Sequence, residues 1–589
     1  MPLTPSAHID TFCRDHLPPA DQWPELEFTL PELTYPDRLN CADALLTETI
    51  ARLGPDRPAL LPQDSAEPAW SYGDLAATAS QIATVLTADL GLVPGNRVLL
   101  RGPNNPWMVA CWFGVVLAGG VVVATMPLLR SAELTTICEI AQVRLALCDD
   151  RFTAELEAAQ VPGLRTVAFA ASGQGSASGS GSGSGSGSED SLNARAATKP
   201  ASFAPVQTAA DDVAIVAFTS GTTGRPKAAM HFHREILAVA DTFSARVLRP
   251  APDDIFTGTP PLAFTFGLGA MLIFPVRAGA ATLLIERATP AELADLIAAR
   301  GVTICSTAPT AYRAMLAAGK AGQLRGLRRP VSAGETLPGS VWQAFYDATG
   351  VAIIDGIGST ELLHIFIAAA DDDIRPGSTG LPVPGYRAAI LSEAGEPVPD
   401  GQPGRLAVKG PTGCKYLGDD RQRSYVGSGG WNFTGDTYIR DADGYYWYQA
   451  RSDDMIVSAG YNIAGPEVEE VLLGHLAVAE CGVVGIPDET RGQIVKAFIV
   501  LADGAAEGDA AEGGTAEGAA GADLVTELQD LVKAKIAPYK YPRSIEFVPA
   551  LPRTNTGKLQ RFKLRTEPAN PTPATTPTPA SSTAGEPEP

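Results

Sequence analysis

The 589-residue chain is longer than one hydrophobic core usually supports, so we expect two or more domains. Hydrophobic residues make up 45% of it and charged residues 19%, which is ordinary for a globular protein. The formal net charge of -21 disfavours a nucleic-acid partner or an anionic membrane surface, so a bound polyanion would need a local basic pocket.

The cysteines and the N-terminus bear on the cellular compartment. Eight cysteines are spread singly from Cys13 to Cys481 without a C-x-x-C pair, so neither a zinc site nor a disulfide framework is indicated. Residues 1–23 contain acidic groups and no apolar core segment, so they do not form a secretory signal. A reducing cytoplasm is the simpler setting, and we expect a cytoplasmic protein.

One uncharged stretch, WMVACWFGVVLAGGVVVATMPLL at 107–129, has about the length of a transmembrane helix. Gly119 and Gly120 divide it into a helix-like half and a β-branched half, VVVAT. This pattern is typical of a buried helix followed by a buried strand. We predict a globular core element here, with a membrane span as the alternative.

A glycine-rich loop, TSGTTGRPKAAM at 219–230, follows an apolar strand predicted at 213–218. Glycines let backbone N–H groups approach an anion, hydroxyls add donors and Lys227 adds a positive charge, so the loop suits phosphate. The spacing does not fit G-x-x-x-x-G-K-[ST], because Pro226 precedes the lysine and no hydroxyl follows it. The loop therefore serves another phosphate chemistry or is a solvated turn.

Helical and strand patterns alternate beyond this loop. Thr289 and Pro290 predict the start of a helix that ends at Gly301, and the buried strand VTICST follows. Such alternation predicts an α/β fold with mainly parallel sheets. After about residue 453 the pattern changes to a helix (PEVEEVLL), paired strands (AECGVVGI and IVKAFIVL) and another helix, which predicts a compact α+β domain.

Three segments differ in composition from the rest of the chain. They are the Gly/Ser run at 173–188, the Ala/Gly/Glu run at 503–522 and the Pro/Thr/Ala tail from about residue 567. Such sequences bury too little apolar surface to offset their ordering entropy, so we expect flexible loops and a flexible tail without chemistry.

Five further motifs follow the glycine-rich loop: SAGETLP at 332–338, DGIGSTE at 355–361, FTGD at 433–436, ARSDDMIVSAGYNIAGPEVE at 450–469 and PRTNTGKLQR at 552–561. Each alone is most often a turn or a solvated group. Taken in this order, the six motifs resemble the adenylate-forming superfamily of acyl-CoA synthetases, luciferases and peptide-synthetase adenylation domains. The resemblance covers about residues 30–565.

The resemblance implies an α/β fold with a large N-terminal domain of mixed sheets layered with helices, and a small mobile α+β C-terminal domain. We expect an AMP-binding and acyl-substrate domain at 1–452 with its flexible insert at 173–188. The mobile domain is expected at 453–565, with a flexible insert at 503–522. A disordered tail is expected at 566–589.

The resemblance also implies ATP, Mg²⁺ and coenzyme A. The residues implied in nucleotide binding are Thr219, Ser220, Gly221, Thr222, Thr223, Gly224, Lys227, Gly334, Glu335, Asp355, Gly356, Asp436 and Arg451. Glu361 is implied as a magnesium ligand together with Thr222, because Mg²⁺ prefers hard oxygen ligands. Thr360 is implied to contact the α-phosphate. The two acidic oxygens of Asp436 suit the ribose hydroxyls.

Lys558, in TNTGK, resembles the catalytic lysine of the family, whose positive charge would stabilise the transition state of adenylation. Asp453 matches the hinge position, and Gly460 matches the glycine that borders the pantetheine tunnel after the small domain rotates. Coenzyme A would supply the nucleophile of the second step. This explains why no Ser-His or Cys-His arrangement is visible.

Within the superfamily, the sequence is most similar to benzoate and 2-aminobenzoate CoA ligases, as in GSTELLHIF at 358–366 and DTFCRDHLPPADQWPEL near the N-terminus. A flat aromatic acid needs an aromatic wall and small neighbours. The residues implied for this slot are Phe264, Thr265, Phe266, Gly267, Ile357 and His364. His364 would hydrogen-bond an ortho substituent, or it is simply packed at the start of a helix.

Our expectation is an aryl acid–CoA ligase that acts on 2-aminobenzoate or benzoate, as a monomer or homodimer, without a nucleic-acid partner or membrane insertion. Two alternatives stay open. One is an adenylating enzyme that transfers its acid to a carrier-protein thiol, and the other is a non-catalytic nucleotide-binding homologue. Fold similarity alone does not decide between them, because luciferases and ligases share these motifs.

Overall fold

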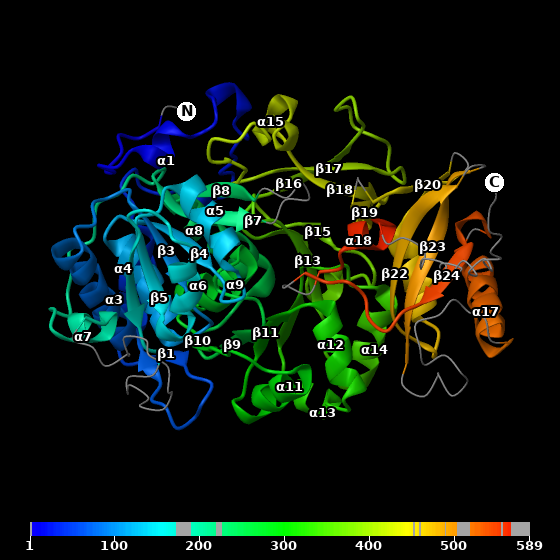
Figure 1. Cartoon of the computed structure of the whole chain (residues 1–589), viewed down its shortest axis with the longest axis horizontal. Helices are drawn as coiled ribbons and strands as arrows, with labels where there is room; N and C mark the ends of the chain where they lie inside the picture. The colour runs from blue at the N-terminus through cyan, green and yellow to red at the C-terminus, as the bar shows by residue number, and fades with distance from the viewer. Residues whose placement is uncertain are drawn as a thin grey trace, which may run out of the picture. The chain divides into compact units, whose positions relative to one another are not determined.

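The computed structural model describes residues 3–171, 190–219, 226–451, 454–458, 461–488, 491–502, 519–536, 538–554 and 558–566. The chain divides into two compact units, Met1–Asp453 and Asp454–Pro589 (Figure 1). The segment at 173–188 and residues 567–589 of the predicted tail lie outside the described residues, whereas Thr566, the first residue of that tail, ends the helix α18 (Arg561–Thr566).

A six-stranded sheet forms one part of the first unit. In spatial order its strands are β6 (Arg165–Phe169), β5 (Leu145–Asp149), β3 (Arg97–Arg101), β4 (Val121–Thr125), β7 (Val213–Thr219) and β8 (Lys227–Phe232). All neighbours run parallel except β7 and β8. Its central strands are almost fully buried, as expected for parallel strands covered by helices on both faces.

The uncharged stretch at 107–129 is a helix and a strand, as predicted. Helix α4 (Pro106–Leu117) begins after Asn105, whose side chain accepts a hydrogen bond from the backbone N–H of Met108. The chain reverses at Gly119, which has a φ of 72°, and continues as β4. None of the helices among the described residues combines the length and the apolar character needed to cross a membrane.

A nine-stranded sheet forms the second part of the first unit. In spatial order its strands are β15 (Leu381–Pro382), β14 (Ile365–Ala368), β13 (Ile354–Gly358), β12 (Arg329–Ser332), β11 (Ile304–Thr307), β9 (Ile255–Gly258), β10 (Ala281–Leu283), β1 (Pro58–Leu61) and β2 (Trp70–Ser71). The six strands from β13 to β1 are parallel, and β2, β14 and β15 pair antiparallel at the two ends.

Helices cover these two sheets. The main ones are α2 (Cys41–Leu53), α3 (Tyr72–Thr84), α5 (Ser131–Ala141), α6 (Thr153–Ala158), α7 (Leu192–Ala197), α8 (His233–Val239), α11 (Pro290–Ala299), α12 (Pro309–Ala317), α13 (Ala321–Leu324) and α14 (Gly339–Thr349). Figure 1 shows α3 beside α4. Helix α11 begins at Pro290 after Thr289, as predicted, and Thr289 and Glu292 form a capping box; Gly301 follows the end of the helix with a φ of 62°.

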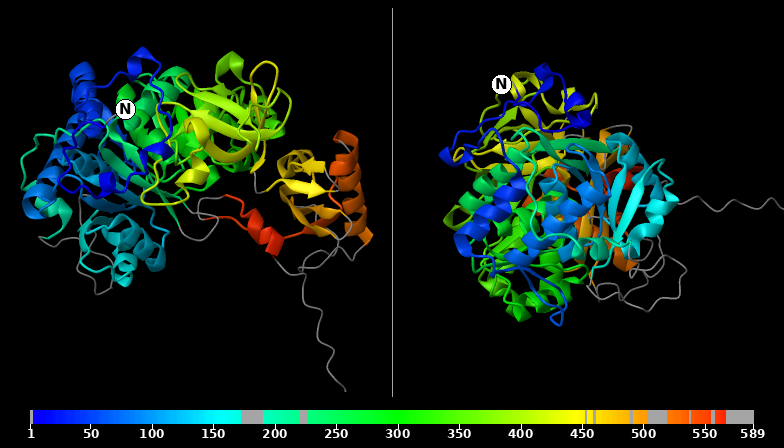
Figure 2. Two further views of the ribbon diagram at one scale, coloured as in Figure 1. Left: turned by 90° about the horizontal axis from the view of Figure 1, so that it is seen from above. Right: turned by 90° about the vertical axis from the view of Figure 1, so that its left-hand side faces the viewer.

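A four-stranded antiparallel sheet completes the first unit: β16 (Arg387–Leu391), β17 (Gly404–Lys409), β18 (Asn432–Arg440) and β19 (Tyr446–Arg451). The N-terminal segment runs beside the chain around residues 410–430, and the two segments lie together in both views of Figure 2. Leu26 forms a β-bridge with Gly410, and the Glu25 N–H donates to the Gly430 carbonyl over 3.0 Å.

The second unit has its own core. The strands β22 (Val478–Asp488), β23 (Gly492–Leu501) and β24 (Ser544–Phe547) form a sheet, and β20 (Ile456–Ser458) pairs with β21 (Tyr461–Ile463). Its helices are α16 (Gly465–Leu473), α17 (Ala519–Lys535) and α18 (Arg561–Thr566). Because α17 begins at Ala519, the last four residues of the predicted insert 503–522 are helical; residues 503–518 lie outside the described residues.

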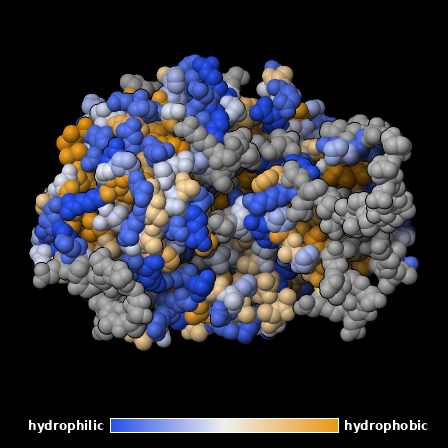
Figure 3. Space-filling model, viewed as in Figure 1, coloured by the Kyte–Doolittle hydropathy of each residue, from blue (hydrophilic) through white to orange (hydrophobic). Residues whose placement is uncertain are grey.

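The surface and the core follow the composition. On the face of the first unit seen in Figure 3, hydrophilic residues cover most of the described area, with apolar residues in smaller areas between them. All eight cysteines are free and buried. The fold is therefore α/β with a smaller α+β unit, as the sequence predicts.

Candidate active site

The glycine-rich loop joins β7 to β8, which pair antiparallel with Thr219 opposite Lys227. The pairing holds the two ends of the loop together at one edge of the six-stranded sheet. The Nζ atom of Lys227 lies 5.2 Å from the ring centroid of Tyr416, within the range of cation–π attraction. The predicted phosphate contacts that fall outside the described residues are Ser220, Gly221, Thr222, Thr223 and Gly224.

The turn between β13 and β14 carries Thr360 and Glu361. The Glu361 side chain is largely buried, and its Oε1 accepts a 2.5 Å hydrogen bond from the hydroxyl of Tyr416. The Thr360 carbonyl oxygen lies 2.8 Å from His231 Nε2. Leu363 has a φ of 69°, which is a strained conformation for leucine, and such strain is concentrated at functional sites.

Behind this turn lies a buried charged group that the sequence did not predict. Lys415 Nζ lies 2.6 Å from Glu235 Oε1, and both side chains are completely buried. Glu235 Oε2 lies 3.3 Å from His231 Nδ1. Burial alone would raise the pKa of Glu235, but the neighbouring Lys415 and His231 bring it well below its ordinary value. The His231 ring therefore lies between the ion pair and the Thr360 carbonyl, with one nitrogen near each.

Four of the predicted nucleotide-binding residues, Gly334, Glu335, Asp355 and Gly356, lie just after β12 or within β13. Ser332 and Asp355 are register partners, and the Ser332 hydroxyl donates to Asp355 Oδ1 over 3.1 Å. Burial raises the pKa of Asp355 to about 8. Gly334 has a φ of 89° and begins the turn that contains Glu335, while Gly356 follows Asp355 in β13.

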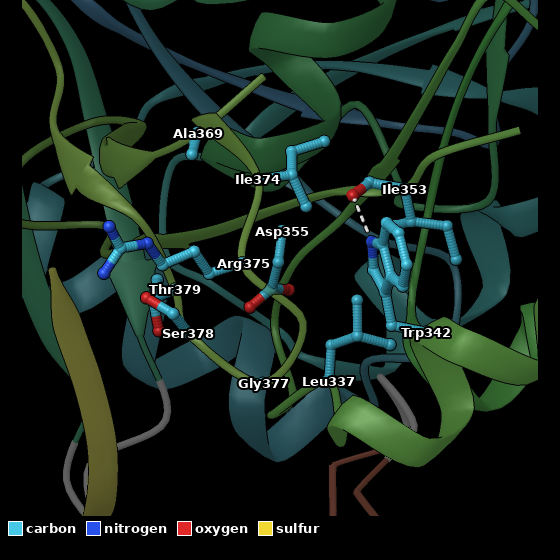
Figure 4. A pocket seen from close by; sticks show the side chains of 10 residues that line it. All are labelled: Leu337, Trp342, Ile353, Asp355, Ala369, Ile374, Arg375, Gly377, Ser378 and Thr379. Carbon is cyan, nitrogen blue, oxygen red and sulfur yellow. Dashed lines mark hydrogen bonds between the residues drawn. The ribbon is translucent and has the colours of Figure 1, made fainter. Parts of the chain in front are cut away.

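Asp355 also points into a small pocket (Figure 4). The pocket is lined by Leu337, Trp342, Ile353, Asp355, Ala369, Ile374, Arg375, Gly377, Ser378 and Thr379. The indole N–H of Trp342 donates to the Ile353 carbonyl over 2.9 Å, which fixes one wall of the pocket. A neutral carboxyl at this position can both donate and accept a hydrogen bond.

Asp436, the predicted ribose-binding residue, faces Arg451, another predicted nucleotide-binding residue, across β18 and β19. Asp436 and Arg451 are register partners, and Arg451 Nη1 lies 3.2 Å from Asp436 Oδ1. Gly435, with a φ of 81°, permits this approach, because a Cβ atom there would lie 3.0 Å from Arg451 Nη2.

His364 lies in an aromatic enclosure directly before strand β14, not at the start of a helix as the alternative interpretation expected. Its ring centroid is 4.5 Å from that of Phe274, 5.4 Å from that of Phe243 and 5.7 Å from that of Phe266. Burial lowers the pKa of His364 to about 3, so the imidazole is neutral at pH 7. Neither ring nitrogen has a partner with hydrogen-bond geometry among the described residues. A buried polar group in this state can receive a ligand.

The other predicted acyl-site residues lie at the start of α9 and in β13. Thr265 begins the short helix α9 (Thr265–Leu268) after Phe264, and a π-helical segment, Gly269–Ile273, follows. Gly267 approaches the backbone so closely that a Cβ atom would lie 2.1 Å from the Pro261 carbonyl oxygen. Ile357, in β13, is half-buried and packs against the main core of the unit.

Lys558 belongs to the second unit. Its N–H donates to Thr554 Oγ1 over 3.1 Å, and its carbonyl accepts from the Thr554 N–H over 2.8 Å. The side chain is exposed. The predicted hinge residue Asp453 and the predicted tunnel residue Gly460 lie outside the described residues.

The described residues offer few side-chain ligands for a magnesium ion. Among the residues described, no group of three or more His, Cys, Asp or Glu side chains is placed to hold a metal. Mg²⁺ is usually bound by one or two carboxylates together with substrate phosphates and water. The buried carboxylate of Glu361 follows Thr360, whose carbonyl contacts His231 of β8, and it fits that mode of binding.

Two family models match the chain. The "AMP-binding enzyme" model matches residues 47–416, and the "AMP-binding enzyme C-terminal domain" model matches residues 467–558. The chain belongs to the AMP-binding enzyme family. This membership confirms the predicted superfamily and its fold.

Relatives of this AMP-binding enzyme include a benzoate–CoA ligase from Thauera aromatica, which is 35% identical over 91% of this chain and 98% of its own length. Among solved structures, the anthranilate CoA ligase AuaEII in complex with anthranoyl-AMP has a TM-score of 0.81 and 34% identity, covering 90% of this chain and 97% of that chain. A benzoate CoA ligase from Burkholderia xenovorans LB400 has a TM-score of 0.76 and 30% identity. The match covers 90% of this chain and 100% of that chain. These relatives confirm the resemblance to the benzoate and 2-aminobenzoate subgroup.

Proposed function

We propose that this AMP-binding enzyme is an ATP-dependent aryl acid–CoA ligase. It would form an aryl-adenylate and pyrophosphate, and then an aryl-CoA thioester, with 2-aminobenzoate or benzoate as the acid. The single observation that carries the substrate class is the neutral imidazole of His364, which is enclosed by three phenylalanine rings and lies three residues after Glu361. The similarity to AuaEII and to two benzoate–CoA ligases supports the same class.

In this proposal the first unit binds and orients ATP. Lys227 and the loop after Thr219 neutralise the phosphates, while Asp436 and Arg451 bind the ribose. Glu361 would hold Mg²⁺, which when bound neutralises phosphate charge. Thr360 would contact the α-phosphate, and the Ser332–Asp355 pair would lie at the adenine.

Lys558 is the proposed catalytic residue of adenylation. Its ammonium would stabilise the negative charge that develops as the carboxylate attacks the α-phosphorus and pyrophosphate leaves. In the second step the thiol of coenzyme A attacks the acyl carbon and AMP leaves. A mobile second unit with its hinge at Asp453 would remove Lys558 for that step and bring Gly460 toward the pantetheine.

The ortho substituent decides between the two candidate acids. A neutral imidazole carries one donor and one acceptor, so His364 could hydrogen-bond the amino group of 2-aminobenzoate. Benzoate would leave these imidazole nitrogens unpaired, and an unpaired buried polar group is costly. This argument favours 2-aminobenzoate.

A pyrophosphate-release assay over a panel of acids tests the proposal. The panel contains benzoate, 2-aminobenzoate, salicylate, phenylacetate and a medium-chain aliphatic acid, each with and without coenzyme A. We expect CoA-dependent thioester formation on the benzoates. Turnover on aliphatic acids alone would reject the aryl assignment, and pyrophosphate release without a CoA thioester would favour transfer to a carrier protein.

A further inference from the structure

A short segment, residues 414–417, lies along the free edge of β8. The Met230 N–H donates to the Lys415 carbonyl over 2.8 Å, and the Leu417 N–H donates to the Ala228 carbonyl over 2.9 Å. The segment therefore extends the six-stranded sheet immediately beyond Lys227, where the phosphate loop returns to the sheet.

Tyr416 projects from this segment to two predicted phosphate-site residues. Its hydroxyl donates to Glu361 Oε1 over 2.5 Å, and its ring lies under Lys227 Nζ at 5.2 Å from the centroid. The side chain is completely buried. One tyrosine thus contacts both the carboxylate and the ammonium, although these residues are 134 positions apart in the sequence.

The backbone of Tyr416 is itself fixed. Its N–H donates to Gln422 Oε1 over 2.9 Å, and Gln422 Nε2 donates to the carbonyls of Cys414 and Gln22 over 3.0 and 2.9 Å. The ring also packs edge-on against Tyr425, with centroids 5.9 Å apart. A side chain held this firmly can restrict the rotamers of a flexible partner.

We propose that Tyr416 is a positioning residue that holds the Glu361 carboxylate and the Lys227 ammonium in their productive places for the phosphates of ATP. Glu361 has several rotatable bonds, and a hydrogen bond to one carboxylate oxygen fixes the direction of the other. The proposal rests on the proposed function of Glu361 and Lys227. It does not depend on which acid is activated.

The test replaces Tyr416 by phenylalanine, which keeps the ring under Lys227 and removes only the hydroxyl. We expect the Mg²⁺ concentration for half-maximal MgATP binding, measured by calorimetry without any acid, to rise about 10- to 100-fold. The kcat of adenylation should fall by a similar factor. The KM for the aryl acid and the rate of thioester formation from supplied aryl-adenylate should stay close to the wild-type values.

Tyr72→Phe is the matched control. Its hydroxyl is also completely buried and donates to the Ala280 carbonyl over 2.8 Å, away from the site. An unchanged Mg²⁺ midpoint in Tyr416→Phe, or an equal change in Tyr72→Phe, would overturn the proposal. A double-mutant cycle with Glu361→Gln adds a second measurement: the effect of Tyr416→Phe on the Mg²⁺ midpoint should disappear in that background, and persistence of the full effect would also overturn it.

Failure of the proposed function would give a different result. If the wild type binds MgATP but activates none of the acids in the panel, the function proposed above fails. The comparison of Mg²⁺ midpoints between the wild type and Tyr416→Phe then still decides whether Tyr416 positions Glu361.

Discussion

Glu235 and Lys415 form an ion pair in which both side chains are completely inaccessible to solvent, with Lys415 Nζ 2.6 Å from Glu235 Oε1. The pair joins α8 to the segment beside β8, and His231 links it to the Thr360 carbonyl. Its charges are therefore satisfied only by each other and by nearby polar groups. Removal of one partner leaves an uncompensated charge in the core.

We predict that Glu235→Gln lowers the free energy of unfolding by about 3–5 kcal/mol, because the Lys415 ammonium remains buried without its counter-charge. Urea unfolding at pH 7 measures the loss. The double variant Glu235→Gln/Lys415→Met removes both charges and should recover most of it. Equal stabilities of the single and double variants would contradict this account of the pair.

The second prediction concerns acid selectivity. His364→Leu replaces the imidazole by an apolar group of similar size, so the ratio of kcat/KM for 2-aminobenzoate to that for benzoate should fall by about 10-fold or more. Competition between the two acids measures the ratio directly. His233→Leu is the control, because His233 is equally buried but contacts Cys41. An unchanged ratio in His364→Leu would show that His364 does not contact the bound acid.

The third prediction concerns the space beside His364. A Cβ atom at Gly269 would lie 2.3 Å from His364 Cδ2 and 3.0 Å from Phe274 Cζ. Gly269→Ala should displace the imidazole, reduce kcat/KM for all aryl acids and destabilise the fold by about 1–3 kcal/mol. Gly322→Ala is the control, because nothing lies within 4 Å of its added Cβ. Similar effects of the two substitutions would mean that the close approach is unimportant.

The fourth prediction separates the two half-reactions. Lys558→Ala should reduce adenylation by about 10²- to 10³-fold, because a charge aimed at the transition state is lost. Thioester formation from supplied aryl-adenylate should be largely retained. Lys533→Ala, which removes a surface lysine paired with Asp530 in the same unit, should alter neither rate. Equal losses in both half-reactions would count against alternation between two positions of the second unit.

The fifth prediction concerns pH. The pKa of Asp355 is raised by burial from an ordinary value of 3.8 to about 8, so between these values the folded protein keeps a proton that the unfolded chain has released. Stability from this group therefore falls as pH rises, by up to about 1.4 kcal/mol per pH unit.

Asp355→Asn mimics the protonated carboxyl at every pH. The difference in Tm between this variant and the wild type, measured without nucleotide, should shift in favour of the variant from pH 5 to pH 8. The surface substitution Asp347→Asn serves as the control. A constant difference between Asp355→Asn and the wild type would show that Asp355 does not keep its proton in the fold.

Local signals in the sequence predicted much of the fold. The start of α11 after Thr289, the glycine that follows α11 and the division of the stretch at 107–129 each depend on residues close together in the chain. The pairing of Asp436 with Arg451 follows from two adjacent strands. Motif order alone located these residues in the sequence.

The buried support of the site could not be predicted in the same way. Lys415 and Glu235 are 180 residues apart, and His231 and Thr360 are 129 residues apart. No local pattern distinguishes a buried lysine from a solvated one, since burial is set by the packing of distant segments. The left-handed φ of Leu363 could not be predicted from the sequence either, because leucine rarely adopts this conformation. GSTELLHIF therefore located Glu361 without indicating what holds it.

The burial of all eight cysteines has a practical consequence. Buried thiols with raised pKa values, such as Cys41 and Cys305, react slowly with maleimides. One cysteine introduced on the surface of each unit would therefore be labelled selectively, without removal of any native thiol. A donor and acceptor dye attached in this way would report the distance between the units by fluorescence energy transfer while ATP, the aryl acid and coenzyme A are added in turn.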